Sequence, residues 1–141
     1  MPLISLRKEF RFEASHRLPY HEGKCARLHG HSWILEVEVA GAVDVYTGMV
    51  VDYDDIKKAV QPLIDDLDHR HLGTWFGLSN HGYDWGVPWL PWDFNSTSEN
   101  LLLVIAKKLP LSFPWTSLTL HETCTCEATL RKEDLNARQT L

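Results

Sequence analysis

The sequence has few cysteines, no long apolar run and no excess of basic residues. Its 141 residues include three cysteines, an odd number without the spacing of a disulfide framework, which indicates a reducing cytoplasm. No stretch approaches the ~18–20 apolar residues of a membrane-spanning helix, and the charges at Arg7, Lys8, Glu9 and Arg11 argue against a signal peptide. Fourteen Lys and Arg against nineteen Asp and Glu give a formal net charge of −5, which argues against nucleic-acid binding. We therefore expect a cytoplasmic protein with no membrane or nucleic-acid partner.

What is present is sufficient for one packed domain. Hydrophobic residues make up 44% of the chain and charged residues 23%, a balance typical of globular proteins. The length fits one domain, residues 1–141. Eight histidines and six tryptophans are unusual for this length, and they gather in particular segments.

Alternation of apolar and polar residues predicts extended structure over 5–18, 28–40 and 117–130. In the last segment the alternation puts Cys124 and Cys126 on the same face as the leucines, where two cysteines are most often part of the core. Polar and glycine-containing stretches follow the first two segments and are typical of turns.

Helical spacing of apolar residues predicts two helices between the extended segments. The first begins at Asp52, an N-cap residue, and the second opens at Ser96, where Glu99 completes a Ser-x-x-Glu capping box. Pro110 ends the second helix. With the strands taken in hairpin pairs, the order ββ-α-α-ββ predicts an α+β fold, a four-stranded antiparallel sheet with two helices on one face.

Three histidines are placed to converge. His29 and His31 are two residues apart on a predicted strand, so both side chains project from one face. His16 lies on the preceding strand, and a hairpin could bring it beside them. Three histidines without a fourth protein ligand are typical of a catalytic zinc site with one open position. The alternative is that they are ordinary half-exposed strand residues.

Cys25 lies in the connector between these two strands, and three residues separate it from His29. Lys24 and Arg27 flank it, and neighbouring cations favour a thiolate. Cys25 is therefore a candidate reactive group, although a fourth zinc ligand is an open alternative.

Two further sites carry acidic residues. Asp68 and His69 follow the end of the first helix, where a carboxylate can orient an imidazole for proton transfer; a simple helix terminus is the alternative. Glu122 alternates onto the face of Leu118 and Leu120, where a carboxylate needs a hydrogen-bond donor. A bulge that turns Glu122 outward is the alternative there.

Five motifs together resemble the 6-pyruvoyl-tetrahydropterin synthase superfamily. They occur in the same order as in that family and cover nearly the whole chain. Within that family, the interval of three residues between Cys25 and His29 resembles the one in bacterial 6-carboxytetrahydropterin synthases of the queuosine pathway. The motifs are Phe-Glu-Ala-Ser-His-Arg-Leu at 12–18, Cys-x-x-x-His-Gly-His at 25–31, Leu-Asp-His-Arg-His-Leu at 67–72, Ser-Thr-Ser-Glu-Asn at 96–100 and His-Glu-Thr at 121–123.

The resemblance implies a fold, an assembly and roles for individual residues. The fold is the tunnelling fold, in which the sheets of several subunits close a barrel, as a homohexamer made of two trimers. Zinc binding is implied for His16, His29 and His31, and proton transfer for Cys25 with Asp68 and His69, the latter pair from a neighbouring subunit. A carboxylate's two acceptors match the ring N–H and amine of a pterin, and the resemblance gives this anchoring role to Glu122, with further pterin contacts from Thr97 and Ser98.

The resemblance further implies a zinc-dependent lyase. It would convert 7,8-dihydroneopterin triphosphate to 6-carboxy-5,6,7,8-tetrahydropterin, acetaldehyde and triphosphate. A 6-pyruvoyl-tetrahydropterin synthase is an alternative activity, and a non-catalytic pterin-binding or zinc-stabilised module is a second alternative. One segment departs from the family pattern: a long tryptophan-rich loop at 73–95, where family members have a shorter link.

Overall fold

The structure is a computed structural model, and it describes residues 1–18, 21–72 and 96–136. The predicted loop at 73–95 lies outside the described residues. The helices and strands, in chain order, are β1 (Ile4–His16), β2 (His29–Gly41), α1 (Tyr53–Leu67), β3 (Arg70–His71), α3 (Ser98–Lys108), β4 (Ser117–Thr123) and β5 (Cys126–Arg131). Two short 3₁₀ turns, η1 (Lys24–Ala26) and η2 (Lys132–Asp134), complete the described elements.

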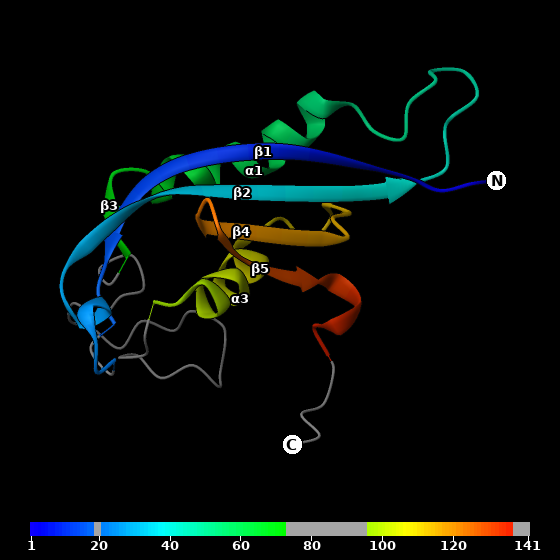
Figure 1. Ribbon diagram of the computed structural model, residues 1–141. Helices are drawn as coiled ribbons and strands as arrows, with labels where there is room; N and C mark the ends of the chain where they lie inside the picture. Colours follow the sequence, from blue (N-terminus) through cyan, green and yellow to red (C-terminus); the bar gives the residue numbers. More distant parts are fainter. Residues whose placement is uncertain (19–20, 73–95, 137–141) are drawn as a thin grey trace.

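The strands form one five-stranded sheet in the order β3-β1-β2-β4-β5. Figure 1 shows the long, curved strands β1 and β2 side by side, with β4 and β5 following. These four strands are antiparallel, which confirms the predicted α+β fold. The fifth strand, β3, was not predicted. It pairs parallel to β1 through Arg70 and His71 only, and two residues are too few to carry a periodic pattern.

The predicted extended segment 117–130 is a hairpin, with the turn at Cys124 and Thr125. Leu118 and Leu120 on β4, and the even-numbered residues of β5 opposite them, share one face. The alternation therefore continues across the turn and conceals it. The expectation that Cys124 and Cys126 belong to the core is wrong, because both lie exposed at this end of the hairpin.

Among the residues that the structure describes, both α-helices pack on one face of the sheet. Inward-facing residues of β1, β2 and β4 join one apolar cluster with five buried residues of α1 and four of α3. Within the described ranges, no helix is both long enough and apolar enough to span a membrane.

The helix starts follow capping chemistry. Asp52 is the N-cap of α1, as predicted, and its side chain accepts the backbone N–H of Asp54. The second helix begins later than predicted, because Thr97 is its N-cap and accepts the N–H of Asn100. Ser96 lies before the cap, where its carbonyl oxygen is free to accept a bond from elsewhere.

Candidate metal centre

The pairing of β1 with β2 brings the three predicted histidines together. His16 ends β1 and lies directly opposite His29, the first residue of β2. His31 is two residues further along β2, on the same face. The ring centroids are 4.5 Å apart for His16 and His29, 5.1 Å for His16 and His31, and 4.9 Å for His29 and His31.

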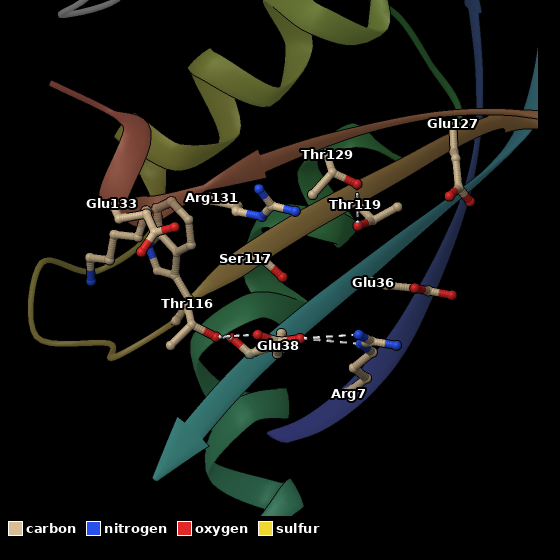
Figure 2. A pocket seen from close by; sticks show the side chains of 12 residues that line it. Arg7, Glu36, Glu38, Thr116, Ser117, Thr119, Glu127, Thr129, Arg131 and Glu133 are labelled. Carbon is tan, nitrogen blue, oxygen red and sulfur yellow. Dashed lines mark hydrogen bonds and ion pairs between the residues drawn. The ribbon is translucent and has the colours of Figure 1, made fainter. Parts of the chain in front are cut away.

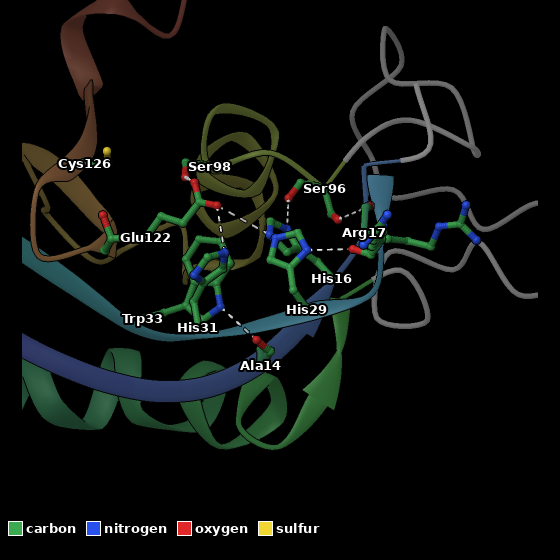
Figure 3. Close-up of polar contacts among 12 residues, drawn as sticks. Ala14, His16, Arg17, His29, His31, Trp33, Ser96, Ser98, Glu122 and Cys126 are labelled. Atoms are coloured by element: carbon green, nitrogen blue, oxygen red, sulfur yellow. Dashed lines mark hydrogen bonds and ion pairs between the residues drawn. The ribbon is translucent and has the colours of Figure 1, made fainter. Parts of the chain in front are cut away.

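Backbone carbonyl groups orient two of these rings. The Nδ1 atom of His16 lies 2.8 Å from the carbonyl oxygen of Ser96, and that of His29 lies 2.7 Å from the carbonyl oxygen of Arg27. A carbonyl oxygen only accepts, so each Nδ1 carries the proton and each Nε2 presents a lone pair. In Figure 3 a dashed line joins His16 to Ser96 beside the other histidines. Such bonds fix the tautomer and the ring orientation of metal-binding histidines.

Glu122 of β4 completes the group. Its Oε1 atom lies 3.0 Å from Nε2 of His31 and 3.5 Å from Nε2 of His16. The hydroxyl of Ser98, at the start of α3, donates to Oε2 over 3.2 Å. A register shift between His121 and Thr123 does occur at this point, but the Glu122 side chain faces the histidines.

This arrangement places several acceptors against one another. His16 is fully buried, and burial lowers its pKa, an effect that the Ser96 carbonyl only partly offsets. Burial also lowers the pKa of His31, against the opposing charge of Glu122. Nε2 of both rings is buried without a hydrogen bond of acceptable geometry. In His16 the Ser96 carbonyl holds the proton on Nδ1, so Nε2 presents a lone pair to the Glu122 oxygen 3.5 Å away. Two such acceptors repel one another unless a cation lies between them.

The donor set fits a metal ion. One ligand atom from each of His16, His29, His31 and Glu122 lies within 4.8 Å of all the others, and no other group of this kind is found among the described residues. Imidazole and carboxylate ligands in a compact group of four suit zinc.

Cys25 lies outside this group. It belongs to η1, in the connector between β1 and β2, and is partly buried. Its carbonyl oxygen accepts the N–H of Leu18, which ties the connector to the end of β1. The side chain that joins the three histidines is therefore that of Glu122 and not that of Cys25.

Asp68 and His69 form a pair at the end of α1. Asp68 accepts the backbone N–H of Glu13 over 2.8 Å and lies 3.0 Å from Nδ1 of His69. The Glu13 N–H, with His69, lowers the pKa of Asp68. His69 has a left-handed φ of 60° and a side chain that is 78% exposed, and it lies outside the group of four side chains that could hold a metal.

Thr97 and Ser98 lie at the start of α3, Thr97 as its N-cap and Ser98 as its first residue. The Thr97 hydroxyl caps the helix, whereas Ser98 is buried and bonded to Glu122.

Sequence reasoning missed the Ser96 carbonyl and the place of Glu122 beside the metal ligands. The alternation that put Glu122 on the inward face was the available signal, but the spacing along the chain could not show which side chains it meets.

Two hollows border the histidine group, and His31 lines both. One, of about 580 Å³, lies where the β2–β4 pairing ends, and its lining includes Glu122 and Cys124. The other, of about 430 Å³, includes His69 and His71. Both volumes are in the usual range of ligand sites, roughly 300–1,000 Å³.

A third hollow, of about 590 Å³, lies on the face of the sheet without helices (Figure 2). Several of its polar groups bond to one another. Glu38 accepts from Thr116 over 2.7 Å and pairs with Arg7 at 3.3 Å, and Thr119 bonds to Thr129. This surface carries none of the four side chains of the metal group.

The chain is similar in sequence to known proteins of one family. Residues 5–133 match the sequence profile of the 6-pyruvoyl tetrahydropterin synthase family. The chain is 47% identical over 78 residues to 6-carboxy-5,6,7,8-tetrahydropterin synthase of Synechocystis sp., an alignment that covers 52% of this chain and 60% of the relative. The match therefore spans less than two thirds of that protein.

Longer matches extend the similarity. The enzyme of the same name from Rickettsia typhi is 30% identical over 135 residues, 88% of this chain and 97% of the relative. A solved structure of Caenorhabditis elegans 6-pyruvoyl tetrahydropterin synthase superposes with a TM-score of 0.74 at 28% identity, covering 93% of this chain and 96% of that one. The fold and the profile together show that this chain belongs to the 6-pyruvoyl tetrahydropterin synthase family.

Proposed function

We propose that this protein is a zinc-dependent 6-carboxy-5,6,7,8-tetrahydropterin synthase that acts on 7,8-dihydroneopterin triphosphate, on the route to queuosine. The observation that carries the proposal is the set of buried imidazole nitrogens facing one carboxylate, in a chain of this family. The 47% identity to the Synechocystis protein of that name favours this branch.

His16, His29 and His31 would hold the zinc ion, with rings oriented by the carbonyl groups of Ser96 and Arg27. When bound, zinc supplies a Lewis acid at the substrate oxygens.

The proton transfers are assigned to this chain's own residues. Cys25, as a thiolate, accepts the substrate proton, and His69 moves it, oriented by Asp68 at 3.0 Å. Glu122 accepts the ring N–H and amine of the pterin, and Thr97 and Ser98 contribute further contacts to the pterin. The products are 6-carboxy-5,6,7,8-tetrahydropterin, acetaldehyde and triphosphate.

The exposure of His69 supports a site completed between subunits. We propose a single domain over residues 1–141 that assembles as a homohexamer, with His69 of one chain serving a neighbour. Light scattering tests the assembly, and a monomer that turns over substrate would contradict it.

A 6-pyruvoyl tetrahydropterin synthase is the second candidate, because the family profile and the Caenorhabditis elegans structure carry that name. Mass spectrometry of the product from 7,8-dihydroneopterin triphosphate separates the two activities. We expect the 6-carboxy product with acetaldehyde; retention of the full side chain would favour the second candidate, and unchanged substrate would contradict both.

A further inference from the structure

Glu122 belongs to two environments at once. Its Oε1 atom is in the compact group with the histidine nitrogens, and its side chain also lines the hollow of about 580 Å³ beyond them. The proposed function needs this carboxylate to hold a pterin, whereas in the structure it faces His31 and His16 (Figure 3).

The distances are those of a metal ligand. Two ligands on one tetrahedral zinc ion are about 3.3 Å apart, because each bond is roughly 2.0–2.1 Å long. Oε1 of Glu122 lies 3.0 Å and 3.5 Å from the two Nε2 atoms, on either side of that value. A carboxylate held there would be the fourth protein ligand.

Four protein ligands would close the site. A catalytic zinc ion keeps one position open for water or substrate, so a fourth ligand of this kind has to leave before substrate binds. The structure gives Glu122 that freedom. The register shift between His121 and Thr123 leaves Glu122 out of the β4–β5 pairing, and the side chain is 27% exposed toward the hollow.

Ser98 holds the second oxygen of the carboxylate. Its hydroxyl donates to Oε2 over 3.2 Å, and Ser98 is buried at the start of α3. The two oxygens of the carboxylate therefore have different partners, Oε2 at the start of α3 and Oε1 at the histidines.

We infer that Glu122 is an exchangeable metal ligand. It binds the metal as the fourth ligand in the resting protein and leaves it when a pterin presents its paired N–H groups, which opens the metal for the side chain of the substrate. The pterin half of this inference rests on the proposed function, and the metal half does not.

Zinc affinity tests the metal half. Glu122→Gln and Glu122→Ala are compared with the wild type by competition with a chelator, with folding checked by circular dichroism. Glu127→Gln is the matched control, because it makes the same chemical change on β5, where Glu127 contacts His121 and not the metal group. We expect at least a tenfold weaker affinity in both Glu122 variants, since losing even a group behind the ligands typically costs 10–100-fold. Wild-type affinity in both would overturn the inference.

Cobalt spectroscopy tests the exchange. Protein loaded with Co²⁺ is titrated with pterin that has no side chain, which offers the N–H groups but no hydroxyl for the metal. We expect its visible absorption bands to shift in the wild type and in Glu127→Gln, and to stay unchanged in Glu122→Gln. A wild-type spectrum that does not change while pterin fluorescence shows binding would overturn the exchange.

These experiments distinguish a failure of the proposed function from a failure of the inference about Glu122. If no pterin binds, the proposed function and the exchange are both wrong, and the chelator competition still decides whether Glu122 is a ligand. If pterin binds but the Glu122 variants keep wild-type zinc affinity, the proposed function stands and the inference is wrong.

Discussion

The two faces of the sheet each carry histidines with carboxylates, but in different geometries. On the face covered by helices, three rings and Glu122 direct their atoms toward one point. On the open face, His121 lies between two carboxylates, with Nε2 3.3 Å from Glu36 and Nδ1 3.0 Å from Glu127. The two nitrogens of one ring point apart, so His121 links two acids and cannot gather them around one ion. Convergence of the donor atoms, and not residue composition, distinguishes the metal centre.

The largest effect is expected from removing a histidine on the covered face. His29→Ala should abolish most zinc binding, because it removes one of three imidazole ligands. His121→Ala, on the open face, should keep about one zinc per chain. Elemental analysis of the purified proteins checks both, and full zinc in His29→Ala would contradict the assignment.

A similarly large effect, on turnover alone, is expected for Cys25→Ala. Because Cys25 lies outside the group of four side chains, this variant should keep its zinc and its fold while losing activity by several orders of magnitude. Joint loss of zinc and activity would instead identify the thiolate as a ligand.

A substitution on the face covered by helices should also cost more stability than one on the open face. Leu35 is fully buried under the helices, and Leu35→Ala should lower the free energy of unfolding by about 2–5 kcal/mol. Thr119→Ala on the open face removes a hydrogen bond between the half-buried Thr119 and the exposed Thr129 and should cost roughly 1 kcal/mol or less. Urea denaturation measures both values, and equal losses would show that the open face is covered in solution.

Acid should weaken the tie between α1 and the edge of β1. The pKa of Asp68 is lowered in the folded state by the Glu13 N–H and by His69. Its stabilising contribution is therefore complete above the unfolded pKa of about 3.9 and is lost as the pH falls through the lower folded value. We expect the stability difference between wild type and Asp68→Asn to shrink over that range, as measured by urea denaturation at a series of pH values. A difference that does not change with pH would mean that the Asp68 charge is not involved.

The smallest effect is expected at the ion pair of the open face. Arg7 is 67% exposed and lies 3.3 Å from Glu38, and exposed pairs contribute about 0–1 kcal/mol. Arg7→Ala should change the free energy of unfolding within that range, and the change should diminish in high salt. A larger loss that is insensitive to salt would indicate that Arg7 is buried in an assembly.

The sequence by itself determined the local features. The two-residue spacing of His29 and His31 puts them on one strand face, the Asp52 side chain begins α1, and alternating apolar residues define β1 and β2. Each follows from chemistry within a few neighbouring residues. The order of these elements also predicted the α+β fold, and the motifs predicted the family.

Only the tertiary structure decided the features that depend on distant segments. The carbonyl of Ser96 meets His16 across 80 positions of the chain, although sequence chemistry placed Ser96 at a helix cap. Glu122 meets His31 because β4 lies beside β2. The strand β3 exists only because the chain after Asp68 returns alongside β1. No local preference encodes such contacts, because they are fixed by the register of strands that pair far apart in the sequence.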